Sequence, residues 1–308
     1  MDVVAALDKT LDEKIELSKE LIKCWYEAHD GNVFVSFSGG KDSTVLLHLV
    51  RSMYPEVVGV FCNTGLEYPE IVKFVKKSEN IRWVKPKKTF RQVIKDYGYP
   101  VVSKMNALKI RRLQNEGPTN QNVCRLYRTG YTSSGHYQRR WKLPKKWFYL
   151  IDAPFKISER CCDVLKKSPM NRFANRNKMY PYLGMMYGDS ENRKLSFRTR
   201  SCNLYDARHP TSNPLAFWTT ENVWEYIKRY DVEYCEIYDM GTDRTGCVFC
   251  MFGVHLDAEP NRFQRLQSTH PKLWHYCINK LGLKEILEYM DIPYKWEEEK
   301  HGKCITER

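Results

Sequence analysis

The chain lacks any long apolar run. Across its 308 residues no stretch approaches the roughly 20 apolar residues that a membrane-spanning helix needs. Its first residues mix charges of both signs and contain no apolar segment typical of a signal peptide. We therefore expect a cytoplasmic protein without a membrane partner, whose 11 cysteines are reduced thiols or metal ligands rather than disulfides. Internal repeats and low-complexity tracts are also missing, which excludes a repeat architecture.

Acidic residues are scarce in the middle of the chain. The formal net charge is +13, and the stretch from Lys104 to Arg200 has 22 Lys and Arg against 6 Asp and Glu. Cations that alternate with stacking surfaces suit DNA or RNA, although a nucleotide alone or plain solvation would also account for the charge. A nucleic-acid partner therefore stays one of three interpretations. The interspersed aromatic residues are Tyr127, Tyr131, Tyr137, Trp141, Trp147 and Phe148.

Apolar runs that alternate with helical patterns predict an α/β fold with a doubly wound, mainly parallel sheet. We expect an N-terminal helix within residues 1–29, a nucleotide-binding domain over 30–255 and a helical extension over 256–308. Residues 104–145 are polar, basic and weakly periodic, which indicates an insertion or a mobile lid. The expected strands are 33–37, 57–61, 81–84, 147–151 and 180–186, and the expected later helices are 222–230, 261–267, 271–281 and 284–290.

A glycine turn separates the first predicted strand from the helix that follows it. Gly39 and Gly40 let successive backbone N–H groups point at one oxyanion, and the helix N-terminus adds partial positive charge. Lys41 adds a full charge, while Ser38 and Ser43 add hydroxyl donors. The pattern predicts a site for a phosphate chain, but it is not the phosphate loop G-x-x-x-x-G-K-S/T, because its glycines are adjacent.

The sequence Ser38-Gly39-Gly40-Lys41-Asp42-Ser43 resembles the pyrophosphate loop (PP-loop) of the adenine-nucleotide α-hydrolase superfamily. That superfamily includes ATP pyrophosphatases, tRNA thiolation enzymes and the phosphoadenosine phosphosulfate (PAPS) reductase family. The resemblance implies that the loop holds the β- and γ-phosphates of ATP with Mg²⁺, that Lys41 and Asp42 take part in catalysis, and that pyrophosphate leaves.

The turn after the second predicted strand is a further candidate. In a doubly wound sheet, ligands bind beyond the C-terminal ends of the strands. Asn63, Thr64 and Glu67, together with Gly65, are therefore candidates for contact with the nucleotide or Mg²⁺. A turn held by its own side-chain hydrogen bonds is the alternative.

Four cysteines form two pairs that are far apart in the sequence. Cys161 and Cys162 are adjacent, whereas Cys247 and Cys250 form a Cys-x-x-Cys pair. Four thiolates favour zinc or an iron–sulfur cluster, and adjacent cysteines suit the larger cluster better; two unrelated thiol pairs remain the alternative. The arrangement resembles the 4Fe-4S signature of adenosine phosphosulfate (APS) reductases and of cluster-bearing PAPS reductase-like proteins, which implies such a cluster here.

The segment from Gly184 to Arg193 resembles the part of that family that places a Ser and an Arg over the substrate phosphates. The resemblance implies that Ser190 and Arg193 bind the nucleotide and that Arg193 acts in catalysis; a plain surface loop is the alternative. The aromatic residues of the later stretch 214–218 are expected to pack in a core.

Two departures from the reductase pattern decide the predicted function. Sulfonucleotide reductases typically lack the intact loop and carry a nucleophilic cysteine in a Glu-Cys-Gly-Leu-His-like tail, whereas this chain keeps the loop and has Cys304 among different neighbours. We therefore expect an ATP-dependent sulfur-transfer enzyme that adenylates an acceptor, such as a nucleic acid, and works with a sulfur-donor or reductant protein. The alternatives are a PAPS or APS reductase that makes sulfite, and a non-enzymatic nucleic-acid-binding partner.

Overall fold

The computed structural model describes residues 2–296. The chain divides into two compact units, and each unit combines two separate stretches of sequence. Unit 1 comprises Met1–Lys87 and Leu165–Gly246, and unit 2 comprises Lys88–Val164 and Cys247–Arg308. In the described part of the chain, no helix combines the length and the apolar character that a membrane crossing requires.

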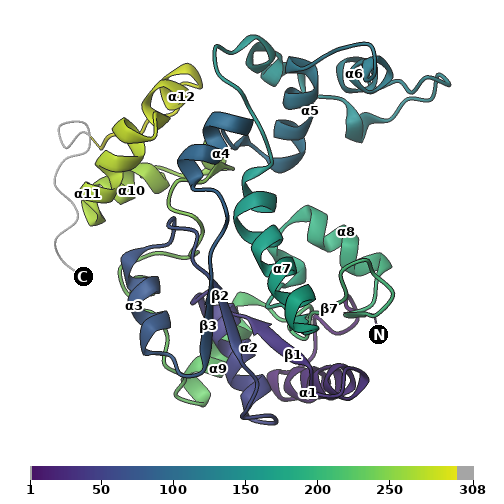
Figure 1. The fold of residues 1–308 in the computed structure, drawn as a ribbon, viewed down its shortest axis with the longest axis vertical. Coiled ribbons are helices and arrows are strands. Elements are labelled where there is room, and N and C mark those ends of the chain that lie inside the picture. The colour runs from purple at the N-terminus through teal and green to yellow at the C-terminus, as the bar shows by residue number, and fades with distance from the viewer. Residues whose placement is uncertain (1, 297–308) are drawn as a thin grey trace. The chain divides into compact units, whose positions relative to one another are not determined.

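Unit 1 is built on a six-stranded sheet in the order β3-β2-β1-β5-β7-β6 (Figure 1). β1 pairs in parallel with β2 and with β5, and the edge pair β6 and β7 is antiparallel. The predicted α/β fold with a mainly parallel sheet is therefore confirmed. The strands are β1 (Val33–Ser36), β2 (Gly59–Cys62), β3 (Ile81–Val84), β5 (Tyr180–Tyr182), β6 (Asn203–Leu204) and β7 (Thr211–Ser212).

The strand order reverses beside β1. Val35 lies opposite Gly59 of β2 on one side and opposite Tyr182 of β5 on the other. The chain therefore runs outward from β1 to β2 and β3, and later resumes on the opposite side of β1 with β5. A reversal of this kind is the topological switch point at which doubly wound sheets bind their ligands.

Helices pack on both faces of this sheet, because successive side chains of a strand point to opposite faces. Val33 and Val35 belong to the larger core, to which α1, α2, α3 and α9 contribute. Phe34 lies on the other face, in a smaller core completed by residues of α7 such as Phe173. The helices of unit 1 are α1 (Leu11–Ala28), α2 (Lys41–Arg51), α3 (Pro69–Lys77), α7 (Ser168–Asn177), α8 (Glu191–Thr199) and α9 (Thr220–Arg229).

The stretch 214–218 packs in the larger core, as predicted. Phe217 and Trp218 are buried there, and the Trp218 indole N–H donates to the Ser18 hydroxyl over 2.9 Å. That hydroxyl in turn donates to the Pro214 carbonyl over 2.8 Å. These bonds connect α1 to the segment that precedes α9.

Unit 2 is mainly helical and contains a short parallel pair of strands, β4 (Val101–Val102) and β8 (Met251–Phe252). The predicted helical C-terminal region is confirmed by its last three α-helices. The α-helices of unit 2 are α4 (Phe90–Tyr97), α5 (Lys104–Gln114), α6 (Gln121–Thr129), α10 (Arg262–Thr269), α11 (Pro271–His275) and α12 (Leu283–Tyr289). The short 3₁₀ and π turns of the whole chain are Arg139–Trp141, Lys145–Asp152, Asp163–Lys167, Tyr187–Asp189, Glu236–Tyr238, Val254–Leu256 and Tyr276–Lys280.

One strand prediction fails in unit 2. The strand predicted at 147–151 is wrong, since Lys145–Asp152 forms a 3₁₀ helix in which Trp147 and Leu150, three residues apart, are the buried positions. The stretch 104–145 contains α5 and α6, and its role as an insertion or a mobile lid stays a prediction. Ala107, Ile110 and Leu113 are buried on one face of α5. The Lys and Arg residues among them obscure this helical spacing in the sequence.

Candidate functional site

The loop after β1 leads into α2 without a capping side chain. Gly40 is the N-cap residue of α2 and forms no side-chain hydrogen bond, whereas Thr10, Ser103 and Ser190 cap α1, α5 and α8. The preceding Gly39 has φ +73°, and a Cβ there would come within 2.9 Å of Ile71 Cγ2. Glycine is therefore required at 39, and Gly40 offers no side chain that would compete with an anion for the first amides of α2.

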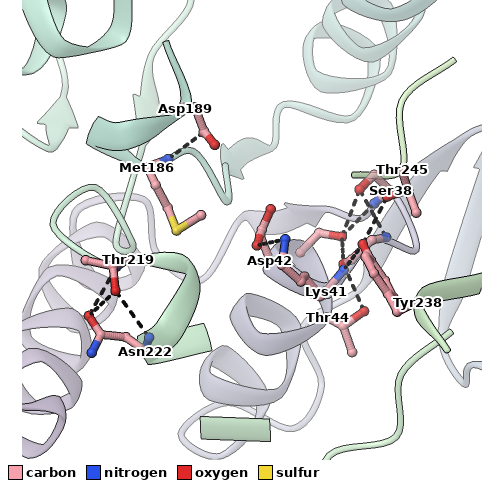
Figure 2. A network of polar contacts seen from close by, with 12 residues as sticks. Ser38, Lys41, Asp42, Thr44, Met186, Asp189, Thr219, Asn222, Tyr238 and Thr245 are labelled. Carbon is pink, nitrogen blue, oxygen red and sulfur yellow. Dashed lines mark hydrogen bonds and ion pairs between the residues drawn. The ribbon is translucent and has the colours of Figure 1, made fainter. Parts of the chain in front are cut away.

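Hydroxyl groups hold the loop in shape before any ligand binds. Ser43 Oγ accepts the Ser38 N–H over 3.1 Å and lies 3.0 Å from Ser38 Oγ. Ser43 and Thr44 both donate to the Gly40 carbonyl, over 2.9 and 3.1 Å. The predicted hydroxyls thus act first on the loop itself, and Figure 2 shows this network around Ser38 and Thr44.

A buried Lys41 and a partly exposed Asp42 form a charge pair at the start of α2. The Lys41 side chain is 5 % exposed, and its Nζ lies 3.3 Å from Asp42 Oδ1. This contact lacks hydrogen-bond geometry, so Asp42 Oδ1 is a buried carboxylate oxygen with no hydrogen-bond partner among the described residues. Such an oxygen fits a hard cation, so the donor set is compatible with the predicted Mg²⁺.

Tyr238 and Thr245 also contact the loop, and sequence reasoning did not identify them. The Lys41 backbone N–H donates to Tyr238 Oη over 2.8 Å, and that oxygen lies 3.1 Å from Thr245 Oγ1 (Figure 2). A Cβ on Gly40 would lie only 2.6 Å from Thr245 Oγ1. Burial raises the pKa of Tyr238 to about 12, so its hydroxyl stays protonated at neutral pH. No local sequence pattern connects Tyr238 and Thr245 with the loop, because roughly 200 residues of chain separate them from it.

The loop after β5 meets the loop after β1 at the switch point. A Cβ on Gly184 would lie 3.2 Å from the Asp42 carbonyl oxygen, so the two backbones are in close contact. Further along this segment, Asp189 accepts the Met186 N–H over 2.9 Å and forms an ion pair with Arg193. Ser190 Oγ accepts the Arg193 N–H as the cap of α8, at 3.4 Å.

Arg193 lies within electrostatic range of the first loop. Burial lowers the pKa of Arg193, the positive charge of Arg244 lowers it further, and the charge of Asp42 opposes both effects. The structure thus brings Arg193 near Asp42, and it adds Arg244, which sequence reasoning had missed. Two guanidinium groups near one carboxylate can stabilise negative charge that a phosphate brings.

The turn after β2 is held by its own side chains. Thr64 donates its hydroxyl to Glu67 over 2.6 Å and its backbone N–H to the same carboxylate over 3.0 Å. Asn63 Oδ1 accepts the Gly65 N–H over 3.0 Å. Within residues 2–296, no hydrogen bond joins these residues to the 38–43 loop, so their role toward a nucleotide stays a prediction.

All four cysteines of the predicted metal site belong to unit 2. Cys161 Sγ lies 3.9 Å from Cys162 Sγ, and Cys250 N–H closes a turn onto the Cys247 carbonyl over 2.9 Å. The hydrogen bond with Cys162 raises the pKa of the Cys161 thiol, and burial raises it further. The charges of Cys250 and Cys247 act in the same direction. The second pair is therefore within electrostatic range of the first.

These thiols are chemically suited to a 4Fe-4S cluster or zinc, but their arrangement is not that of a closed metal site. Among the described residues, no group of three or more His, Cys, Asp or Glu side chains is placed to hold a metal ion. The cluster and its ligands therefore stay a prediction. Cys304, the tail cysteine that only the reductase alternative would use as a nucleophile, lies outside the described residues.

Comparison with known proteins assigns the family. Residues 32–115 and 142–252 match the model of the phosphoadenosine phosphosulfate reductase domain. The chain belongs to the PAPS reductase domain family. The resemblance inferred from the loop and the cysteine pairs is thereby confirmed, and the match includes the 38–43 loop, Arg193, Arg244 and all four cysteines.

Curated relatives extend beyond this chain. The uncharacterized proteins MJ0066 and MJ0973 of Methanocaldococcus jannaschii are 25 % and 26 % identical over 96 % and 93 % of the chain. The chain spans only 50 % and 58 % of their lengths. An adenosine 5'-phosphosulfate reductase of Bacillus cereus is 22 % identical over 74 % of this chain and 77 % of the relative.

Two solved structures are similar at low identity. A PAPS reductase from Candida auris in a phosphate complex matches 78 % of this chain and 96 % of its own, with 15 % identity and a TM-score of 0.41. The U34-tRNA thiolase NcsA from Methanococcus maripaludis with its 4Fe-4S cluster matches 96 % of this chain and 86 % of its own, with 13 % identity and a TM-score of 0.38. Neither likeness is strong enough to bear on function.

Proposed function

We propose that this member of the PAPS reductase family uses ATP to adenylate an acceptor and releases pyrophosphate. One observation carries the proposal: α2 begins at an intact, uncapped glycine loop that places the Lys41 side chain and Asp42 Oδ1 together. The start of α2 suits a phosphate, and the Asp42 carboxylate oxygen that lacks a hydrogen bond suits Mg²⁺.

The residues of unit 1 divide the chemistry among them. The acceptor oxygen attacks the α-phosphorus, and the bond to the bridging oxygen breaks with its electron pair leaving on pyrophosphate. Lys41 and the α2 amides neutralise the leaving pyrophosphate, and a phosphate oxygen takes the Lys41 N–H in place of Tyr238 Oη. Arg193 and Arg244 balance the charge that develops at the α-phosphate.

The four cysteines of unit 2 would complete a sulfur transfer. If Cys161, Cys162, Cys247 and Cys250 hold a 4Fe-4S cluster, or zinc in its place, the bound group would supply a site for the sulfur that displaces AMP from the acceptor. A sulfur-donor or reductant protein would then return the bound group to its starting state. The steps at ATP proposed above depend on unit 1 alone.

A sulfonucleotide reductase is the second candidate. Curated relatives favour it, since the Bacillus cereus protein described above is an APS reductase. Such a reductase would attack the sulfate sulfur of PAPS or APS with a thiolate and yield sulfite. Cys304 is the only cysteine in the last 30 residues of the sequence, and it is therefore the candidate nucleophile.

The two candidates differ in their products. Protein purified without oxygen should be given ATP, PAPS or APS in separate reactions, and pyrophosphate, AMP and sulfite should be measured. We expect pyrophosphate and AMP from ATP, unchanged in Cys304→Ser, and no sulfite. Thioredoxin-dependent sulfite that disappears in Cys304→Ser would instead establish the reductase.

A further inference from the structure

The family match skips one segment of unit 2. The model of the reductase domain matches up to residue 115 and resumes at 142, and thus leaves out residues 116–141. This segment, the 116–141 insertion, contains α6 and the hairpin that follows it. The family match therefore assigns this segment no role, and its role has to be argued from its own residues.

The insertion is folded and anchored to α5. Cys124 and Tyr127 are its buried residues on α6, and the Tyr127 carbonyl accepts the Leu143 N–H over 2.7 Å. Lys109 of α5 is only 3 % exposed, and its Nζ donates to the carbonyls of Arg140 and Lys142 over 2.8 and 3.0 Å. These hydrogen bonds therefore fix α6 and the C-terminal end of the insertion against α5 and Leu143.

The hairpin presents two tyrosine rings to solvent. Tyr131 and Tyr137 pair across it, with ring centroids 5.1 Å apart, and they are 46 % and 53 % exposed. The Thr132 hydroxyl accepts the His136 N–H over 3.0 Å and orders the turn between them. A Cβ on Gly130 would come within 2.5 Å of the Tyr137 ring, so the position of this ring depends on the glycine.

Cations flank these rings in the sequence, and acidic residues are nearly absent from the insertion. Glu116 is the single acidic residue of the insertion, and it pairs with Arg128 over 2.7 Å. Arg125, Arg139 and Arg140 are exposed, and no carboxylate of residues 2–296 forms an ion pair with them. Exposed, unpaired guanidinium groups are suited to bind phosphates with paired N–H groups.

We propose that the 116–141 insertion is a docking surface for single-stranded nucleic acid. Phosphodiester groups pair with Arg125, Arg139 and Arg140, and unpaired bases stack on Tyr131 and Tyr137. An acidic protein would satisfy the arginines but gives no reason for two outward rings between them. The proposal rests on the proposed function in one respect: it identifies the bound strand as the acceptor that the enzyme adenylates.

The surface can be tested by binding alone. Fluorescence polarisation at about 50 mM salt would compare a labelled single-stranded RNA, a DNA of the same sequence, a DNA duplex and a polyglutamate peptide. We expect a single strand to bind more tightly than the duplex or the peptide, and the comparison of RNA with DNA shows which strand is preferred. Its affinity should fall with salt, and Arg139→Gln with Arg140→Gln should make the slope shallower by about 1 to 1.5.

The tyrosines supply the decisive variants. Tyr131→Ala with Tyr137→Ala should weaken single-strand binding by about 10- to 100-fold, whereas the exposed Tyr230→Ala and Arg91→Gln should leave it unchanged. Gly130→Ala keeps both rings but displaces Tyr137, so it should weaken binding even if the double variant is unstable. Circular dichroism checks the fold of each variant.

The proposed docking surface would be refuted if no single strand binds, or if the duplex or polyglutamate binds as tightly as a single strand. It would also be refuted if both the tyrosine double variant and Gly130→Ala bind like the parent. Pyrophosphate release from ATP, measured on the same proteins, separates the two proposals. If ATP is not turned over but binding depends on the tyrosines, the proposed function fails and the surface stands. If ATP is turned over but binding does not depend on the tyrosines, the docking surface is refuted and the proposed function stands.

Discussion

At Lys41, one residue carries two of the contacts expected for a phosphate: a backbone N–H at the start of α2 and a buried ammonium group. Lys41→Ala removes the ammonium group and should cost about 1.5–3 kcal/mol of binding free energy. The affinity for ATP should therefore fall by tens of fold. Calorimetry with ATP and Mg²⁺ measures it. Lys9→Ala, an equal charge change at an exposed position of unit 1, should have no effect. Unchanged ATP affinity in Lys41→Ala would refute the assignment of the loop.

Tyr238 competes with the ligand for the same backbone donor, since its hydroxyl accepts the Lys41 N–H over 2.8 Å. Tyr238→Phe frees that donor, so ATP no longer displaces a hydrogen bond worth about 1 kcal/mol. We expect ATP to bind several-fold more tightly and the ligand-free protein to melt at a slightly lower temperature. The gain should persist between pH 7 and 9, because the pKa of Tyr238 is raised to about 12. A weaker affinity for ATP would show that Tyr238 binds the nucleotide itself.

At the scale of elements, the cysteine pairs are carried by two separate stretches of unit 2, a helical turn at 161–162 and the turn before β8. Protein purified without oxygen should be brown and contain iron and sulfide in equal amounts. Replacing Cys161, Cys162, Cys247 or Cys250 by Ser should remove the colour, whereas Cys24→Ser, at an exposed site, should not. Zinc without iron would refute the cluster but keep the ligands, and no metal of either kind would refute both.

Some elements could be predicted from sequence because burial dominates their pattern. β1 is buried on both faces and reads as a continuous apolar run, and β3 appears with the predicted bounds 81–84. The 3₁₀ helix Lys145–Asp152 contains a similar apolar run, but its buried positions recur every three residues. Short apolar runs do not distinguish these two periods.

The candidate site was predictable only where its residues are consecutive. The 38–43 loop could be identified because strand, glycines and helix follow one another in sequence. Tyr238, Thr245 and Arg244 come to the loop from a distant segment, and no local pattern marks them. That convergence follows from how the whole of unit 1 folds.

At the scale of the whole molecule, each unit contains one half-buried histidine with a ring nitrogen that lacks a hydrogen-bond partner in the described structure: His29 in unit 1 and His255 in unit 2. Burial lowers the pKa of both below 6.5. The unfolded chain then binds more protons than the folded chain as the pH falls through about 6.5, so the free energy of unfolding decreases there.

Urea unfolding at pH 7.5 and 5.5 should therefore show lower stability at the acidic pH. Carboxylates with lowered pKa, such as Glu13 and Asp257, contribute mainly below this window. His29→Gln and His255→Gln should each reduce the loss, whereas the exposed His209→Gln should not. Equal stability of the parent at both pH values would contradict the prediction.

The alternation of the two units along the chain has a consequence for synthesis on the ribosome. β1 emerges early, but its neighbour β5 begins at Tyr180, after the first half of unit 2 has been translated. At bacterial or eukaryotic elongation rates, β1 waits on the order of ten seconds with one edge unpaired. An unpaired strand edge invites pairing with other chains. Slow codons between residues 88 and 179 should therefore lower the soluble yield, and chaperones that cover nascent chains should be most needed in this interval.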